Sequence, residues 1–157
     1  MLPAGTDAPD FSVPDSHGQT HSLASQRGKW VLLWWYPEAG SGSCSIQAAS
    51  LGTRYEDFQQ AGVTVWGISF NTVERNDAFS CDYDLGFPLL SDVDHTVGQA
   101  YGVTRAPDER FADKPRRVSF VIDPHGQIAF SELVPNESLP AYADRALVQI
   151  RSAQVQQ

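Results

Sequence analysis

Hydrophobic residues form two continuous runs that favour β-strands. Residues 30–36 read Trp-Val-Leu-Leu-Trp-Trp-Tyr and stop at Pro37, and residues 63–69 are similarly rich in β-branched and aromatic side chains. Unbroken apolar runs of this length are typical of strands covered on both faces, as in a parallel sheet. We therefore expect residues 30–36 to form a central strand and residues 63–69 to form a second strand.

The segment between these runs has the periodicity of a helix. Ala48, Leu51, Tyr55 and Phe58 recur at intervals of three or four residues, which places them on one helix face, and Gly62 can end such a helix. A polar, glycine-containing loop at residues 38–43 comes before the stripe. The first turn of this helix is therefore expected to contain Cys44.

The rest of the chain alternates between the two patterns. The expected elements are a hairpin of residues 11–13 and 20–22, a helix from Asn71 to about Tyr83 with Glu74 completing a capping box, a strand at 88–90, a short helix capped by Asp94 or Thr96 and ending near Gly102, a hairpin of residues 117–123 and 127–133, and a closing helix capped by Ser138. This order indicates an α/β fold with an N-terminal hairpin and a sheet that carries helices on both faces.

Length and composition narrow the class of protein. The chain has 157 residues, of which 41% are hydrophobic, so we expect one globular domain over residues 1–157 and not a disordered chain. The net charge of −8 opposes binding to nucleic acid or to an anionic membrane. The apolar runs are too short to span a bilayer, and the N-terminus has no signal-peptide pattern. We expect a cytoplasmic protein.

Two cysteines, Cys44 and Cys81, are the candidates for chemistry. A thiol at a helix N-terminus is favoured as an anionic thiolate, since backbone N–H groups and the helix dipole face it. Free cysteine is also among the most buried residue types, so an inert packing role is the alternative. These residues alone leave both interpretations of Cys44 open.

Spacing excludes several other chemistries. A C-x-x-C dithiol would need cysteine where Gln47 stands, and a C-x5-R phosphatase loop would need arginine where Ser50 stands. Residues 40–43 lack the lysine of a phosphate-binding P-loop, and the four histidines show no cysteine-protease pattern. Asp92, Asp94 and His95 favour a turn and a helix cap over a metal site. We expect neither a cofactor nor a metal.

The residues around Cys44 resemble a family signature. Pro37, Ser41 and Cys44 stand in the pattern P-x-x-x-S-x-x-C directly after the aromatic-ended strand, and this is similar to the peroxiredoxin active-site signature P-x-x-x-T/S-x-x-C. The resemblance extends to residues 8–11, 67–69, 87–92, 101–103 and 117–123, and the segments Leu-Leu-Ser-Asp and Arg-x-x-Phe are similar to the bacterioferritin-comigratory-protein or Q subgroup. It implies a thioredoxin fold and a thiol peroxidase.

The resemblance also implies roles for individual residues. Cys44 would attack the peroxide and become a sulfenic acid, Ser41 would hydrogen-bond the thiolate and the peroxide, Pro37 would shield the pocket, and Arg117 would pair with the thiolate. Residues 105–117 contain five basic and three acidic residues, a charge of +2, which leaves −10 on the rest of the chain. Only the family pattern selects Arg117 over Arg116.

A second thiol would resolve the sulfenic acid. One branch of the subgroup has this cysteine five residues after the first, where the present chain has Ala49, and another branch has it on the following helix, where Cys81 fits. A disulfide needs Cα atoms within about 7 Å, so helix ends would have to unwind. The implied cycle reduces hydrogen peroxide or organic hydroperoxides, forms a Cys44–Cys81 disulfide and is completed by a thioredoxin-like reductant acting on a monomer.

Three alternatives remain open at this stage. The chain could be a one-cysteine peroxidase, in which Cys81 is inert. It could be a disulfide oxidoreductase on the same fold, although the missing C-x-x-C argues against this class. It could also be a redox-sensing or binding module that oxidises slowly.

Overall fold

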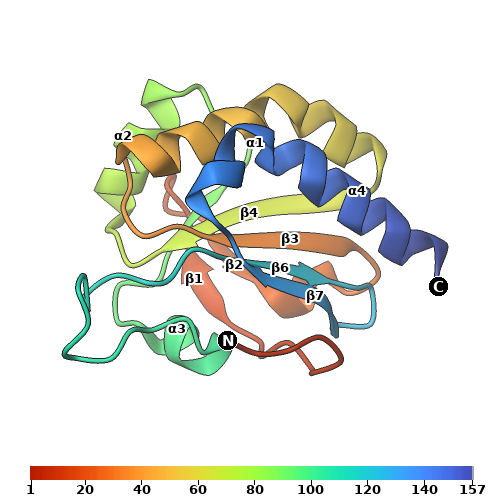
Figure 1. The fold of residues 1–157 in the computed structure, drawn as a ribbon, viewed down its shortest axis with the longest axis horizontal. Coiled ribbons are helices and arrows are strands. Elements are labelled where there is room, and N and C mark those ends of the chain that lie inside the picture. Colours follow the sequence, from red (N-terminus) through yellow and green to blue (C-terminus); the bar gives the residue numbers. More distant parts are fainter. Residues whose placement is uncertain (157) are drawn as a thin grey trace.

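A five-stranded mixed sheet lies at the centre of the molecule. The structure is a computed structural model and describes residues 1–156. The strands are β3 (Trp30–Trp35), β4 (Val63–Ser69), β5 (Leu89–Ser91), β6 (Val118–Ile122) and β7 (Ile128–Leu133). They lie in the order β5-β4-β3-β6-β7, with β3 parallel to β4, β4 parallel to β5, and the other two pairs antiparallel. The two apolar runs thus form neighbouring strands in the middle of the sheet (Figure 1).

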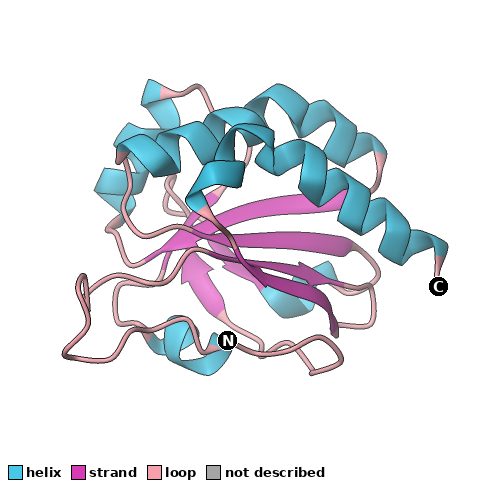
Figure 2. Cartoon of the chain, viewed as in Figure 1, coloured by secondary structure: helices cyan, strands magenta, loops and turns pink. Residues whose placement is uncertain are grey.

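Helices cover both faces of the sheet. On one face lie α1 (Gly42–Gln60), α2 (Val73–Asp82) and α4 (Tyr142–Val155), the last preceded by the 3-10 helix η2 (Asn136–Ala141). On the other face lie α3 (Thr96–Tyr101), the 3-10 helix η1 (Leu23–Gln26) and the hairpin of β1 (Ser12–Pro14) and β2 (Thr20–Ser22). Figure 2 shows the three longer helices together above the strands. This is the expected α/β thioredoxin-like fold with an N-terminal hairpin.

The pleat of β3 divides its side chains between two hydrophobic cores. Leu32, Trp34 and Tyr36 face the core under α1 and α4, whereas Leu33 and Trp35 face the core under α3 and the hairpin. All five side chains are fully buried. This burial on both faces explains why the run contains no polar residue.

A buried polar network joins α2 to the sheet. The Tyr36 hydroxyl donates to Asn76 Oδ1 at 2.6 Å, and Asn76 Nδ2 donates to Ser91 Oγ at 2.9 Å and to the Leu90 carbonyl at 3.3 Å. Burial raises the pKa of Tyr36 and outweighs the Ser69 hydrogen bond, which lowers it, so the phenol stays protonated. These bonds position the first two turns of α2 beside the end of β3.

Two expected helix caps were wrong. The N-cap of α2 is Thr72, whose hydroxyl accepts from Arg75 N, because the Asn71 side chain is bonded to Ala39 N instead. Ser138 lies inside η2 and donates to the Pro135 carbonyl, so the α-helix itself begins four residues later, at Tyr142.

The cap of α3 is more elaborate than the sequence predicted. The Asp92 carboxylate accepts from Val97 N at 3.1 Å and from Gly98 N at 2.8 Å, while Asp94 accepts from Thr96 N. Burial raises the pKa of Asp92 more than these backbone bonds lower it. Both carboxylates therefore serve the turn and the helix start, and within residues 1–156 no cluster of His, Cys, Asp and Glu suits a metal ion.

Residues 102–117 connect α3 to β6 without a helix or strand. Arg116 N bonds the Val103 carbonyl at 2.8 Å, which brings the two ends of this loop together. The loop projects beside the carboxyl-terminal end of β3, at the lower left of Figure 1. Among residues 1–156, no helix is both long and apolar enough to cross a membrane.

The tight contact at Gly67 gives a test of this packing. A Cβ there would lie 2.7 Å from Leu89 Cδ2 and 2.8 Å from Trp34 Cζ2, so Gly67→Ala is expected to lower the free energy of unfolding by about 1–3 kcal/mol in urea titrations. Gly52→Ala is the matched control, because its Cβ would meet nothing closer than Leu85 Cδ2 at 3.8 Å on an exposed helix surface. This control should raise the free energy of unfolding by about 0.5–1 kcal/mol. Equal stability of the two variants would contradict the packing described for β4.

Candidate active site

The loop after β3 delivers Cys44 to the first turn of α1. Ser41 is the N-cap of this helix, and its Oγ accepts a hydrogen bond from Cys44 N at 3.3 Å. The Ser45 hydroxyl donates to the Ser41 carbonyl at 2.7 Å, which fixes the loop to the helix from the other side. The Cys44 side chain is fully buried in this first turn, at the positive end of the helix dipole.

Arg117 lies against the Cys44 sulfur. Its Nη1 is 3.5 Å from Cys44 Sγ and donates to Gln47 Oε1 at 2.7 Å, and the arginine itself is only 8% exposed. The neighbouring Arg116 points elsewhere and pairs with Glu109 Oε1 at 2.6 Å. Of the two adjacent arginines, the structure brings Arg117 to the thiol.

Gln47 is a residue of this site that the sequence interpretation missed. It follows Cys44 by three positions, so it shares the helix face that the thiol occupies, and this spacing was the available signal. Its side chain is fully buried, and within residues 1–156 its Nε2 has no hydrogen-bond partner. The Arg117 guanidinium is thus held between the thiol and a neutral amide oxygen.

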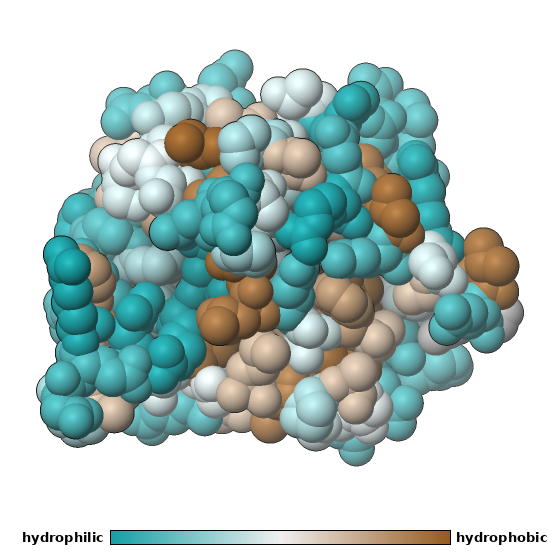
Figure 3. All heavy atoms as spheres, viewed as in Figure 1, coloured by the Kyte–Doolittle hydropathy of each residue, from teal (hydrophilic) through white to brown (hydrophobic). Residues whose placement is uncertain are grey.

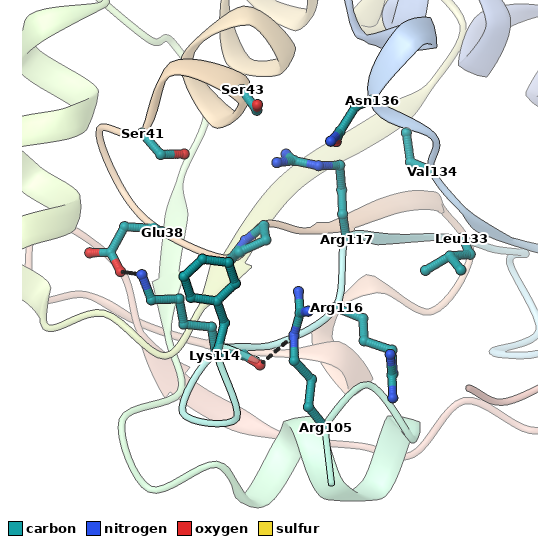
Figure 4. Close-up of a pocket in the computed structure, with 12 residues that line it drawn as sticks. Glu38, Ser41, Ser43, Arg105, Lys114, Arg116, Arg117, Leu133, Val134 and Asn136 are labelled. Atoms are coloured by element: carbon teal, nitrogen blue, oxygen red, sulfur yellow. Dashed lines mark hydrogen bonds and ion pairs between the residues drawn. The ribbon is translucent and has the colours of Figure 1, made fainter. Parts of the chain in front are cut away.

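A surface cavity of about 600 Å³ opens beside Arg117. Pro37, Ser41 and Arg117 all line it, and they come from the end of β3, the start of α1 and the start of β6. Figure 4 shows Arg117 extending toward the space between Ser43 and Asn136. The other lining residues are Glu38, Ser43, Arg105, Phe111, Lys114, Arg116, Leu133, Val134 and Asn136. Residues far apart in the sequence therefore meet at one opening, and Arg117 connects its wall to the buried Cys44 thiol.

Comparison with known proteins is consistent with this arrangement. The model of the AhpC/TSA family matches residues 4–131. The chain is 38% identical over 129 residues to "Peroxiredoxin Bcp" of Escherichia coli strain K12, covering 81% of this chain and 83% of that protein. It is also 36% identical to the chloroplastic "Peroxiredoxin Q" of Sedum lineare, over 79% of this chain and 65% of that protein.

The chain is a peroxiredoxin of the Bcp/PrxQ subgroup. Peroxidoxin BcpB of Mycobacterium tuberculosis has the same fold, with a TM-score of 0.85, 28% identity, and coverage of 97% of this chain and 98% of that chain. The protein is therefore a thiol peroxidase of the AhpC/TSA family.

The second cysteine of this peroxiredoxin lies apart from the cavity. Cys81 is an exposed free thiol in the last turn of α2, where its Sγ lies 3.8 Å from Asp77 Oδ1, whereas Cys44 is a buried free thiol in the first turn of α1. Neither cysteine lines the cavity itself, but Cys44 contacts the lining residue Arg117. Of the five candidate residues, four gather at one place and Cys81 does not.

Glu38 connects three parts of the peroxiredoxin at the cavity edge. Its carboxylate pairs with Lys114 Nζ at 2.7 Å and with Arg75 Nη2 at 2.5 Å, and it accepts from Asn71 Nδ2 at 3.3 Å. Burial raises the pKa of Glu38, but the Lys114 hydrogen bond and the charges of Arg75 and Lys114 together lower it by more, so the pKa lies below its usual value. The ionised carboxylate thus holds the residue after Pro37 to the 102–117 loop and to α2.

This shift predicts a pH-dependent contribution to stability. Because the folded-state pKa lies below the unfolded value of about 4.3, the contribution is full above that value and is lost as the pH falls through the folded pKa. Glu38→Gln should unfold about 1 kcal/mol more easily in urea at neutral pH, with a difference that shrinks below about pH 4. Glu56→Gln, on the exposed face of α1, is the control and should match the native chain throughout. A constant difference across this range would show that the ion pairs do not stabilise the site.

Proposed function

We propose that Cys44 is the residue that reduces the peroxide, with hydrogen peroxide and organic hydroperoxides as substrates. The observation that carries this proposal is the 3.5 Å contact between Arg117 Nη1 and Cys44 Sγ at the start of α1. A guanidinium and a helix N-terminus both favour negative charge on sulfur, and the thiolate is the nucleophilic form of cysteine.

The reaction follows from this placement. The Cys44 thiolate attacks the terminal oxygen of the peroxide, an S–O bond forms and the O–O bond breaks. The electron pair of the O–O bond leaves with the second oxygen, which takes a proton and departs as water or an alcohol. Sulfur is thereby oxidised to a sulfenic acid and the peroxide is reduced.

Ser41 and Arg117 hold the peroxide in line with the sulfur. Because Ser41 Oγ accepts from Cys44 N, its own O–H is free to donate to the thiolate or to a peroxide oxygen. Arg117 stabilises the charge that develops on the leaving oxygen, and Pro37 limits access of water. The family usually has threonine at this position, so Ser41 lacks the methyl group that restricts side-chain rotation.

Cys81 resolves the sulfenic acid in this proposal. Its thiol attacks the sulfenic sulfur, water leaves and an intramolecular disulfide forms. Cys44 is buried in the first turn of α1 and Cys81 is exposed in the last turn of α2, so one or both of these turns open to let the sulfurs meet. The exposed Gly40, with φ of +82°, and Gly42 ease this movement, and a thioredoxin-like protein then reduces the disulfide.

Two other functions would use the same fold. A one-cysteine peroxidase is favoured by the exposed position of Cys81 beside Asp77 at the end of α2, and a slow redox sensor is favoured by the complete burial of Cys44. The second-order rate of Cys44 oxidation by hydrogen peroxide distinguishes a sensor from a peroxidase, because a sensor would react about as fast as free cysteine. We further propose that the chain, residues 1–157, acts as one domain and as a cytoplasmic monomer.

Thiol counting tests the two-cysteine cycle. One equivalent of hydrogen peroxide should remove both free thiols of the native chain, because each sulfenic acid is captured as a disulfide. Cys81→Ser should complete the first turnover and then stall with thioredoxin as the donor. Thiol titration measures the number of free thiols, and peroxide consumption measures the number of turnovers.

A matched control addresses the position of the mutation. Ser80→Ala changes the preceding residue of the same turn, leaves both thiols and should cycle as the native chain does. Loss of a single thiol in the native chain, or normal cycling of Cys81→Ser, would establish the one-cysteine function instead.

A further inference from the structure

Arg105 is a cation of the cavity wall that is held in place by neutral groups. Its Nε donates to the Lys114 carbonyl at 3.2 Å and its Nη2 donates to the Pro115 carbonyl at 3.3 Å. Figure 4 shows its guanidinium extending from the side of α3 toward the middle of the cavity. In the described part of the chain, no carboxylate oxygen lies within 4.0 Å of its nitrogens.

The other three cations of the wall already have partners. Lys114 pairs with Glu38, and Arg116 pairs with Glu109. The third, Arg117, contacts Cys44 and Gln47. Arg105 also interacts at longer range with Glu109, whose pKa its charge helps to lower, but it is the one of these four cations whose guanidinium or ammonium contacts only backbone carbonyls.

The charge of the cavity is opposite to that of the whole protein. Four basic residues and one carboxylate line it, whereas the chain as a whole carries −8. A concave basic site on an acidic protein concentrates small anions at that site. Neutral hydrogen peroxide gains nothing from this field, so the charge indicates a second kind of substrate.

An apolar wall adjoins these charges. Phe111 and Leu133 line the cavity while remaining 47% and 58% exposed, and Pro37 and Val134 complete this wall. In Figure 3 hydrophobic atoms gather near the middle of this face, to the right of a hydrophilic region. Exposed apolar side chains beside a pocket of this size suit an organic body much larger than hydrogen peroxide.

We infer that the cavity selects organic hydroperoxides that carry a carboxylate, and that Arg105 is the residue that recognises this carboxylate. This inference rests on the proposed reaction at Cys44. The carboxylate binds the Arg105 guanidinium, the apolar body packs on Phe111 and Leu133, and the hydroperoxide group reaches Arg117 and the sulfur. The Cys44 thiolate bonds to the terminal oxygen as the O–O bond breaks. The other oxygen stays on the organic body and gains a proton, so the product is a hydroxy carboxylate.

A matched pair of substrates tests the inference. The probes are para-carboxy cumene hydroperoxide and its methyl ester, which differ in charge but share the reacting group. The native chain should show a kcat/KM about fivefold higher for the acid, as expected for one partly exposed ion pair. Raising the ionic strength from about 0.01 M to about 1 M should remove this preference, because the screening length falls from about 30 Å to about 3 Å.

Variants of the loop assign the preference to Arg105. Arg105→Gln should bring the acid-to-ester ratio close to one, while Arg105→Lys should keep part of the preference because the charge remains. Arg151→Gln is the control, since it removes an equal charge from an exposed position on α4 and Arg151 does not line the cavity. It should keep the ratio of the native chain.

Three outcomes would overturn the inference. They are an acid-to-ester ratio near one in the native chain, an unchanged ratio in Arg105→Gln, and an equal loss in Arg151→Gln. The salt titration of the native chain tests the carboxylate preference even if Arg105→Gln folds poorly, and Arg105→Lys, which keeps the charge, then tests its assignment to Arg105. Absence of turnover with acid, ester and hydrogen peroxide alike would instead overturn the proposed reaction at Cys44.

Discussion

A buried guanidinium needs compensation for its charge, and in this peroxiredoxin that need is met at the sulfur of Cys44. Arg117 is 8% exposed, and in the described residues it has no carboxylate partner within 4.0 Å. Its nearest acceptors are the neutral Gln47 oxygen and the thiol. An uncompensated buried charge is costly, so the position of Arg117 against the sulfur is a strong constraint on the site. In the proposed reaction this cation lies where the thiolate and the leaving oxygen require one.

The sheet makes this contact possible. β3 and β6 are antiparallel neighbours, so the end of β3, which leads into the Cys44 loop, lies beside the start of β6, which Arg117 precedes. The hydrophobic cores on the two sides of β3 fix both ends of the contact in a rigid layer. The surrounding loops are held by polar contacts instead, including the Glu38 ion pairs and the Arg105 bonds to backbone carbonyls. Hydrophobic packing thus positions the thiol site, and polar contacts position the wall of the cavity.

Local sequence patterns predicted the helices and strands well, but they did not predict contacts between segments far apart in the sequence. The run at residues 30–36 indicated a strand buried on both faces, and the spacing of Pro37, Ser41 and Cys44 indicated the site without any tertiary information. Arg117 lies 73 positions from Cys44, so only the family pattern distinguished it from Arg116. Asn71 and Thr72 can both cap a helix, and the choice depended on Ala39 N, which recruits the Asn71 side chain from another loop. The pairing of Glu38 with Lys114 and Arg75 is likewise a product of the fold.

The most direct test of the central claim is the second-order rate constant for Cys44 oxidation by hydrogen peroxide in a Cys81→Ser background. The account predicts a value far above that of free cysteine, and a loss of at least about 100-fold in Arg117→Met, because one charged donor is removed from the reacting atoms. Arg54→Met, a surface change on α1, should leave the constant unaltered. A native value close to that of free cysteine, or equal rate constants with and without the Arg117 guanidinium in folded protein, would contradict the account.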